Sequence, residues 1–435
     1  MRALGVLFLS ASIAACSAPE RNTAETAISP RVEQAFERLQ ADAKVRQALE
    51  AVKANDAAMF EEQRRITEIP APPFKEAARA AYYLRKLQDA GLRDAAIDRE
   101  GNVVGVRRGA GGPRLVVSAH LDTVFPEGTD VRVREKDGKF YAPGLGDDGL
   151  GLVTLLSVLQ AMEKTGVRTV GDVIFVGTVG EEELGDLRGV KALFRERKDI
   201  DGFISIDGTT LGRIVNHATG SHRYEVAFRG PGGHSFAAFG QPSAIHAMGR
   251  AIAKIDELKP PADPKTTFTV GTVRGGTSVN AIAAEAVMGI DMRSDSSSEL
   301  LRLEEQVMAA IRAAAAEENA RWGSDAIRVE LKLVGDRPAG TTSADSPIVQ
   351  ASRRGLSAVG ARVLGVAGAS TDSNIPISLG IPAVTLSGGG LGGASHSPGE
   401  WYSPLNAWVG TQSVLLTTLA LVGVEGVSEP LLARR

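Results

Sequence analysis

Histidine and acidic side chains recur near the ends of short apolar runs in this sequence. The set comprises His120, Asp122, Asp147, Glu181, Glu182, Asp207 and His396. Imidazole and carboxylate groups together suit zinc, with manganese or cobalt as alternatives, and the set lacks the thiolates of a structural zinc site. Adjacent carboxylates such as Glu181 and Glu182 repel each other, and bound cations offset that repulsion. The pattern therefore predicts a centre that holds a pair of divalent metal ions.

The apolar runs that lead to these residues read as strands of one sheet. They are Leu115–Ala119, Val173–Val176, Phe203–Ile206 and Ala383–Leu386, with a leucine-rich segment of helix length at Gly149–Lys164 between the first two. Alternation of strands and helices predicts an α/β fold with a mostly parallel sheet flanked by helices. Ligands of such sheets bind beyond the carboxyl ends of the strands, which is where each polar cluster falls.

Helices are expected before the first strand. Helical spacing extends over residues 31–68 and stops at the prolines of Ile69–Phe74, which cannot continue a helix. A further helix is expected at Lys75–Ala90.

The middle of the chain has a different order of elements. Strand-like segments near 223–228, 267–273, 286–292 and 327–334 alternate with segments of helix length near 242–258 and 298–319. This β-α-β-β-α-β order is typical of an α+β domain inserted into another domain. We expect the main domain, which carries the metal centre, at residues 35–218 and 335–435, and the inserted domain at residues 219–334.

The N-terminus predicts export. Arg2 and the apolar run Ala3–Ala15 have the make-up of a secretory signal peptide and are too short to span a bilayer. Ile13-Ala14-Ala15-Cys16 resembles the bacterial lipobox, whose cysteine is lipidated, so we expect a lipoprotein-type signal peptide at residues 1–16 and a polar tether at residues 17–34. The protein would then lie in the cell envelope or periplasm, anchored at Cys16. A cleaved signal peptide with an incidental cysteine is the alternative.

The composition excludes several other classes. The net charge is -3, and aromatic residues make up 5% of the chain. Neither a basic excess for phosphate contacts nor an aromatic platform for bases is present, so nucleic acid is not an expected partner. Cys16 is the only cysteine, which rules out an intramolecular disulfide.

Four segments with the candidate ligands occur in a fixed order. They are His120-Leu-Asp-Thr-Val124, Gly144-Leu-Gly-Asp-Asp-Gly149, Gly180-Glu-Glu182 and Ser395-His-Ser-Pro-Gly-Glu400. Together they resemble the co-catalytic two-zinc exopeptidases and deacylases, a family that includes peptidase T, glutamate carboxypeptidase and aminoacylase. The resemblance covers nearly all of the chain after the tether.

The resemblance implies how the metal ligands divide. One metal would be held by His120 and Asp207, the other by Glu182 and His396, and Asp147 would bridge the two. Without a metal, Asp207 reads as part of an Asp-Gly turn and Asp147 as a helix N-cap.

The resemblance also implies the roles of three further acids. Asp122 would hydrogen-bond the imidazole of His120 and fix its tautomer. Glu181 would be the general base, taking a proton from water activated by the metals and delivering it to the leaving amine. Glu183 has no counterpart role and is expected to be solvent-exposed or outside the ligand set.

The inserted domain resembles the family's lid or dimerisation domain. In Gly230-Pro-Gly-Gly-His-Ser235, His234 would reach the active site of a partner subunit and contact the developing oxyanion, which implies a homodimer. Asn280 and Arg293 would bind the carboxylate or backbone of the substrate. A glycine-rich turn and an arginine at a strand end are the alternatives.

In the family, the type of acidic residue at the position of Asp207 differs between enzymes with different substrates. Aminopeptidases and dipeptidases of the family tend to carry aspartate there, whereas carboxypeptidases and deacylases tend to carry glutamate. Asp207 therefore favours the peptidase T-like branch, which cleaves the amide bond of short peptides near a terminus. An N-acyl amino acid deacylase or carboxypeptidase of the same family is the nearest alternative. A non-catalytic envelope binding protein is the alternative of another class.

Overall fold

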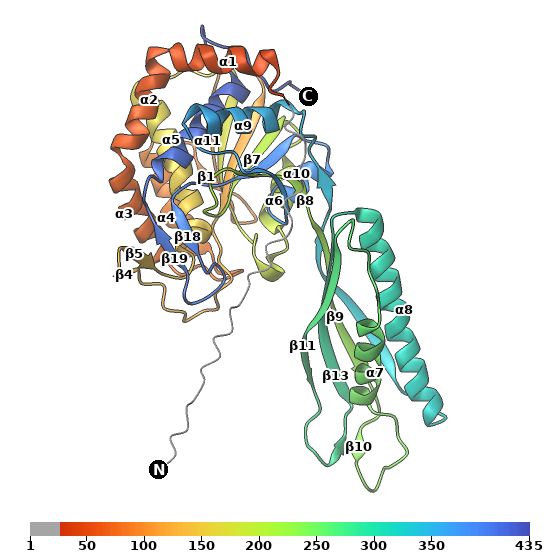
Figure 1. Ribbon diagram of the computed structural model, residues 1–435. Helices are drawn as coiled ribbons and strands as arrows, with labels where there is room; N and C mark the ends of the chain where they lie inside the picture. Colours follow the sequence, from red (N-terminus) through yellow and green to blue (C-terminus); the bar gives the residue numbers. More distant parts are fainter. Residues whose placement is uncertain (1–26) are drawn as a thin grey trace, which may run out of the picture.

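The computed structural model describes residues 27–435, which form a larger domain and a smaller one that extends from it (Figure 1). The predicted signal peptide and Cys16 lie outside the described residues. The predicted tether, 17–34, extends too far. Helix α1 (Pro30–Ala41) already begins at a proline, which suits the first turn of a helix, and its Val32 is buried. Residues 30–34 therefore belong to the folded domain.

The helical stretch expected at residues 31–68 is divided into three helices, which are α1, α2 (Ala43–Ala54) and α3 (Asp56–Thr67). The first break is at Asp42, whose carboxylate accepts the backbone N–H of Val45 at 2.9 Å and caps α2. After the proline-rich segment, α4 (Ala77–Asp89) forms at the place expected.

The larger domain is built on a nine-stranded sheet, and its order is β1-β2-β6-β3-β7-β17-β8-β15, with β16 paired to β8. The strands are β1 (Ala96–Ile97), β2 (Val103–Arg107), β3 (Arg114–His120), β6 (Asp172–Thr178), β7 (Gly202–Ile206), β8 (Arg213–Ala218), β15 (Gly340–Thr341), β16 (Gly365–Ala369) and β17 (Ala383–Leu386). The central strands β6, β3, β7 and β17 are parallel, so their carboxyl ends meet at one edge. The predicted α/β fold is confirmed.

Helices cover both faces of this sheet (Figure 1). Helices α5 (Leu150–Thr165), α9 (Pro347–Ala358) and α11 (Trp408–Val422) form the main core with the N-terminal helices, and α6 (Arg188–Glu196) and α10 (Asn374–Ser378) cover the other face. The stretch Leu145–Thr165 is long and apolar enough to cross a membrane, but its most apolar window of 18 residues is 89% buried in the protein. It is therefore placed as a core helix.

Short elements complete the edge of the larger domain. A small sheet joins β18 (Leu391–Gly393), β19 (Trp401–Ser403), β5 (Lys139–Tyr141) and β4 (Arg134–Lys136), and single turns form η1 (Leu145–Gly149) and η2 (Glu183–Gly185). This sheet brings the segment before η1 beside the C-terminal segment that contains His396, because Trp401 pairs with Tyr141.

The smaller domain has the expected β-α-β-β-α-β order. Its elements are β9 (Gly220–Arg229), β10 (Gly233–His234), α7 (Ala244–Asp256), β11 (Thr266–Gly275), β12 (Ala281–Ile282), β13 (Glu285–Ser294), α8 (Ser297–Arg321) and β14 (Arg328–Arg337). The main strands are ordered β11-β13-β9-β14. The elements of this domain run from Gly220 to Arg337, whereas the predicted boundaries are 219 and 334.

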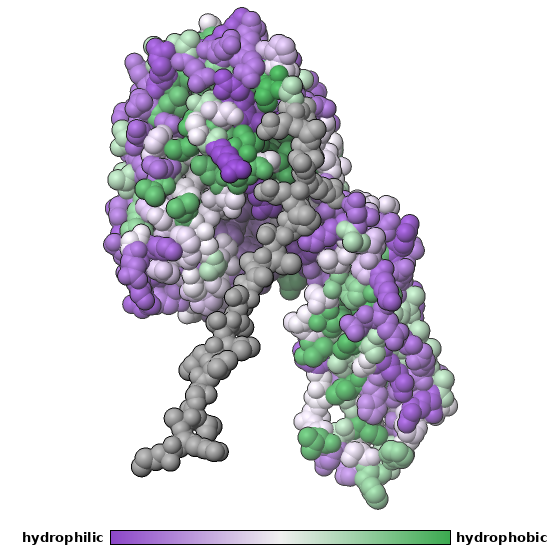
Figure 2. Space-filling model, viewed as in Figure 1, coloured by the Kyte–Doolittle hydropathy of each residue, from purple (hydrophilic) through white to green (hydrophobic). Residues whose placement is uncertain are grey.

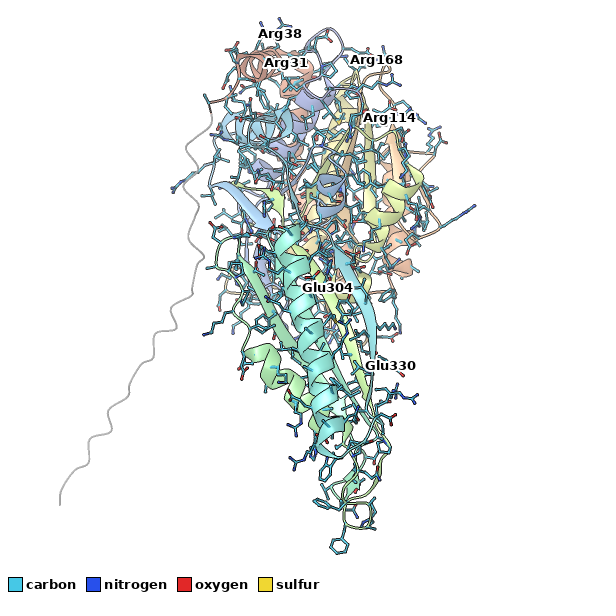
Figure 3. All side chains as sticks on the ribbon, turned by 90° about the vertical axis from the view of Figure 1, so that its right-hand side faces the viewer. Arg31, Arg38, Arg114, Arg168, Glu304 and Glu330 are labelled. Carbon is cyan, nitrogen blue, oxygen red and sulfur yellow. The ribbon has the colours of Figure 1, made fainter. Side chains whose placement is uncertain are left out.

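Helices α7 and α8 pack on one face of this second sheet, in front of the strands in Figure 3, and Figure 1 shows no helix on its other face. Glu304 lies on α8 near the larger domain, whereas Arg31, Arg38, Arg114 and Arg168 lie at the opposite end of the molecule (Figure 3). The surface is mostly polar, but apolar groups gather at the free end of the smaller domain (Figure 2). Phe236 and Val279 are exposed there, at 89% and 104%.

A buried arginine supports the chain below the predicted metal centre. Arg79 of α4 is fully buried and donates hydrogen bonds to the backbone carbonyls of Thr67, Ile69 and Leu121, with the last bond at 2.8 Å. Burial lowers the pKa of Arg79 to about 10, and the charges of Asp122 and Asp148 oppose that fall. Arg79 therefore holds three carbonyls and offsets buried negative charge with one side chain.

Replacing Arg79 by methionine should destabilise the fold by about 3–5 kcal/mol, because carbonyls and buried carboxylates lose their cationic partner. Arg85→Met is the matched control, since Arg85 lies exposed on the same helix and should cost less than about 1 kcal/mol. Urea unfolding of both variants measures the difference. Equal stability of the two variants would contradict the role assigned to Arg79.

Candidate metal centre

The predicted metal ligands gather at one edge of the main sheet. His120 is the last residue of β3, Glu182 follows β6, and Asp207 follows β7. His396 arrives from the loop between β18 and β19, and Asp147 lies in η1. The structure thus brings all five together beyond the carboxyl ends of the parallel strands, as expected for a ligand site in such a sheet.

Asp147 lies between the two histidines. Its Oδ1 is 3.0 Å from Nε2 of His120, and its Oδ2 is 3.1 Å from Nε2 of His396. The same Nε2 of His396 is 3.1 Å from Oε1 of Glu182. One carboxylate that presents an oxygen to each imidazole has the arrangement required of a bridging ligand.

The second ligand group contains His120, Asp148 and Asp207, whose ligand atoms lie within 4.8 Å of one another. Asp148 is already used by the backbone, because its two oxygens accept the N–H groups of His120 and Gly151, both at 3.0 Å. Asp207 is therefore the acid available to a metal beside His120. Burial, followed by the charge of Asp147, raises the pKa of Asp207 to about 7.

The residues fit a pair of divalent cations. Imidazole nitrogens and carboxylate oxygens form the donor set, and Asp147, Glu182 and His120 bring ligand atoms within 4.8 Å of one another. Carboxylates held so close together in a buried site disfavour one another's ionised forms. Bound cations offset this repulsion and favour the ionised forms. His120 and Asp207 would hold one ion, Glu182 and His396 the other, and Asp147 both.

Asp122 acts differently from its predicted role. The Nδ1–H group of His120 donates to the backbone carbonyl of Asp122 at 3.0 Å, whereas the nearest carboxylate oxygen is 3.7 Å away. The tautomer is thus set by the backbone, leaving Nε2 for a metal. The carboxylate of Asp122 instead accepts the N–H groups of Glu181 and Glu182 at 3.1 and 2.9 Å. Its side chain positions the glutamate loop rather than the imidazole.

The loop after β6 turns sharply before the glutamates. Gly180 has φ of +69°, a conformation that glycine tolerates best, and a Cβ there would lie 2.7 Å from Cγ of Arg188. Only glycine therefore fits the turn that directs Glu181 and Glu182 toward Asp122.

Glu181 has a cationic partner that the sequence did not reveal. Arg337, the last residue of β14, places Nη1 3.3 Å from Oε1 of Glu181 and donates through Nη2 to the backbone carbonyl of the same residue. Both side chains are buried. Burial raises the pKa of Glu181 well above its usual range, and the charge of Arg337 opposes that rise.

Glu183 contributes through its backbone. Arg223 of β9 donates Nη1–H to the carbonyl of Glu183, and its Nε lies 2.9 Å from Oδ1 of Asp291. The other oxygen of Asp291 accepts Nε–H of Arg293 at 2.7 Å. Two arginines of the inserted domain, Arg223 and Arg337, therefore hold the carbonyls on either side of Glu182.

The loop that carries Asp147 is hydrogen-bonded to a residue near the C-terminus of the chain. Glu400 is buried, and its carboxylate accepts the N–H groups of Gly144, Gly146 and Asp147 at 2.9, 2.8 and 3.1 Å. Burial raises the pKa of Glu400 to about 7. Glu400 thus connects the segment of His396 to the loop that carries Asp147, a role that the quoted motif did not disclose.

A cavity of about 780 Å³ opens beside the metal ligands and is large enough for a small peptide. Of the residues predicted to bind substrate, Arg293 lines this cavity. His234 and Asn280 do not, because both lie at the exposed free end of the inserted domain, where β10 pairs with β12. Within one chain the structure does not bring these two residues to the metal centre.

Replacing Asp122 by asparagine should weaken metal binding about 10- to 100-fold, because one acceptor for the glutamate loop becomes a donor facing a backbone N–H. The control is Glu183→Gln in the same loop, whose side chain lies outside the ligand set and should leave the metal affinity unchanged. Competition with a chromogenic chelator measures both variants. If Asp122→Asn bound metal like the wild type, the loop would not depend on this carboxylate.

Comparison with known proteins agrees with this geometry. Residues 116–420 match the sequence profile of peptidase family M20/M25/M40. Carboxypeptidase G2 of Pseudomonas sp. (strain RS-16) is 26% identical over 198 residues, which cover 44% of this chain and 47% of that protein. The chain spans about half the length of the curated relatives it matches.

Solved structures share the fold. Aminopeptidase PepT of Bacillus cereus ATCC 10987 superposes with a TM-score of 0.67 at 24% identity, covering 83% of this chain and 98% of that one. A dinuclear metal-binding peptidase of Bacillus subtilis gives a TM-score of 0.63 at 16% identity, covering 85% and 99%. The family predicted from the four motifs is confirmed. The chain belongs to peptidase family M20/M25/M40, and its fold resembles that of aminopeptidase PepT.

Proposed function

We propose that the protein is a metal-dependent hydrolase that cleaves the amide bond of short peptides near a terminus, as an aminopeptidase or dipeptidase. The observation that carries the proposal is a buried glutamate, Glu181, placed next to the ligand Glu182 at the wall of the cavity. A general base beside a metal-ligand cluster is the arrangement that amide hydrolysis needs. Zinc suits the donor set best, with manganese or cobalt as alternatives.

The residues of the chain divide the work of hydrolysis. When bound, the two metals supply an acidified water, with a pKa of roughly 7, and polarise the scissile carbonyl. Glu181 takes the proton from that water and passes it to the leaving amine. Its raised pKa suits a group that must hold a proton between the two steps. Arg337 keeps the side chain of Glu181 in place and limits that rise.

A carboxypeptidase or N-acyl amino acid deacylase is the second candidate, and the charges of the cavity favour it. Arg213, Arg223, Arg293 and Arg337 line the cavity, and arginine matches a carboxylate bidentately. Of the cavity's carboxylates, Glu183 alone lies outside the predicted ligands and base. A free substrate amine would have few partners here. Comparing N-acylated with C-amidated dipeptides as substrates decides between the two candidates.

Dimerisation is part of the proposal. His234 lies far from the cavity of its own chain, at the exposed end of the inserted domain. In a homodimer that end would reach the cavity of the partner, where His234 would stabilise the developing oxyanion.

The location is a separate proposal. It rests on the lipobox-like Ile13–Cys16, and labelling with palmitate in wild type and Cys16→Ala tests it.

Replacing Glu181 by glutamine should lower kcat about 10²- to 10⁴-fold, because the amide keeps the shape of the side chain but cannot accept the proton. Metal content, measured by elemental analysis, should stay that of the wild type. The control is Glu135→Gln, an exposed glutamate of β4 away from the cavity, which should keep full activity. Unchanged turnover in Glu181→Gln would refute the base assigned here.

Mixing His234→Ala with Glu181→Gln subunits should restore activity that neither variant has alone. Each mixed dimer has one site with both groups intact, so random exchange gives about a quarter of the wild-type activity. The measurement is turnover after subunit exchange in mild denaturant. No recovery, with mixed dimers present by mass spectrometry, would show that His234 does not act across the interface.

A further inference from the structure

Three of the four arginines in the cavity already pair with carboxylates of the chain. Arg337 pairs with Glu181 at 3.3 Å, whereas Arg223 and Arg293 both pair with Asp291, at 2.9 and 2.7 Å. An arginine paired with a carboxylate of its own protein gives up part of its attraction for a ligand. The fourth arginine, Arg213, differs.

Arg213 forms no ion pair with any residue the structure describes. Arg213 is exposed, and its Nη2 donates to the backbone carbonyl of Gly368 at 2.9 Å, which orients the guanidinium without cancelling its charge. A single bond of this kind leaves the other N–H groups of the fork available. Arg213 is therefore a positioned cation in the cavity wall that lacks an anion.

The topology places Arg213 beside the metal ligands. It begins β8, which runs antiparallel to β17 and pairs Val215 with Thr385. The start of β8 therefore lies toward the carboxyl end of β17, at the edge where the ligands gather. Thr209 and Thr210, in the loop that joins Asp207 to β8, line the same wall.

Arg213 also approaches the partner of the base. Gly368 accepts its hydrogen bond, and two residues further along the hydroxyl of Ser370 lies 3.3 Å from Nη1 of Arg337. Two guanidinium groups thus contact one short segment that borders the cavity. Arg337 pairs with Glu181, whereas the guanidinium of Arg213 is free to bind a ligand.

The overall charge of the cavity points the same way. Its carboxylates are Asp147, Glu181, Glu182, Glu183 and Asp207. Two divalent cations would offset four of them, so the arginines would then exceed the remaining negative charge. A cavity that holds both metal ions would therefore carry a net positive charge, which attracts anionic substrates and repels cationic ones.

We propose that Arg213 forms a subsite for a second anionic group of the substrate, so that the preferred substrates are acidic dipeptides or N-acylated acidic amino acids. One carboxylate would face the arginines of the inserted domain, and the second would bind the guanidinium of Arg213. The proposal rests on the proposed amide hydrolysis and names the substrate class within it.

Substrate pairs that differ only in charge test the subsite. Dipeptides with glutamate or glutamine at the first or at the second position are compared by kcat/KM at low salt. The wild type should prefer the glutamate member of at least one pair by about 10- to 100-fold, the range for a charge-assisted hydrogen bond. The position at which the preference appears assigns the side of the scissile bond that faces Arg213.

Variants of Arg213 then connect that preference to the residue. Arg213→Gln should bring the ratio close to one, Arg213→Glu should reverse it, and Arg213→Lys should keep an intermediate ratio because it retains the charge without the fork. Arg85→Gln, an exposed arginine outside the cavity, is the matched control and should keep the wild-type ratio. A wild-type ratio near one for both pairs, or an unchanged ratio in Arg213→Gln, overturns the proposal.

A binding measurement separates this proposal from the proposed reaction. N-acetylglutamate and N-acetylglutamine are titrated calorimetrically into metal-loaded Glu181→Gln, which should not hydrolyse them, and into the double variant Glu181→Gln/Arg213→Gln. The single variant should bind the dianion about 10- to 100-fold more tightly than the monoanion, and the double variant should bind the two alike. If no amide is hydrolysed but this selectivity holds, the reaction fails and the subsite stands. If amides are hydrolysed without selectivity, the reaction stands and the subsite fails.

Discussion

Mutual repulsion among carboxylates at one edge of a sheet is the constraint on which the rest of the structure depends. Glu182 and Asp207 converge there because parallel strands end there, and η1 brings Asp147 to the same edge. The protein holds such groups in place with cations and with backbone N–H groups. Arg79 lies below the cluster and Arg337 beside it, while Asp122, Asp148 and Glu400 are held by N–H donors. Two divalent metals would complete this balance.

Local sequence was enough to predict that the candidate ligands lie together at one edge of the sheet, and which strands lead to them. Each ligand follows an apolar run or lies in a glycine-rich loop, so its place at the sheet edge depends on the chain nearby. The arginines are different. Arg337 reaches Glu181 across 156 residues, and Glu400 reaches Gly146 across 254. No local pattern records such contacts, because they form only when the inserted domain and the C-terminal segment return to the sheet.

The prediction that the carboxylate of Asp122 binds the imidazole of His120 failed for a more specific reason. Spacing placed this residue near His120 but could not tell which of its acceptors, the carbonyl or the carboxylate, would face the imidazole. The structure uses the carbonyl for the imidazole and the carboxylate for the loop of Glu181. The predicted tether extended too far along the chain for a related reason, because polar composition alone did not show that Val32 packs into the core.

The hydrogen bonds from Arg223 and Arg337 to the backbone carbonyls around Glu182 limit how the inserted domain can be exchanged. An inserted domain is usually regarded as an interchangeable module, free to be lost or exchanged between relatives. Here its first and last strands supply the side chains that hold the carbonyls of Glu181 and Glu183. A chimaera with a different insertion would therefore have to supply arginines at the same two places, or the glutamate loop would lose both of these hydrogen-bond donors.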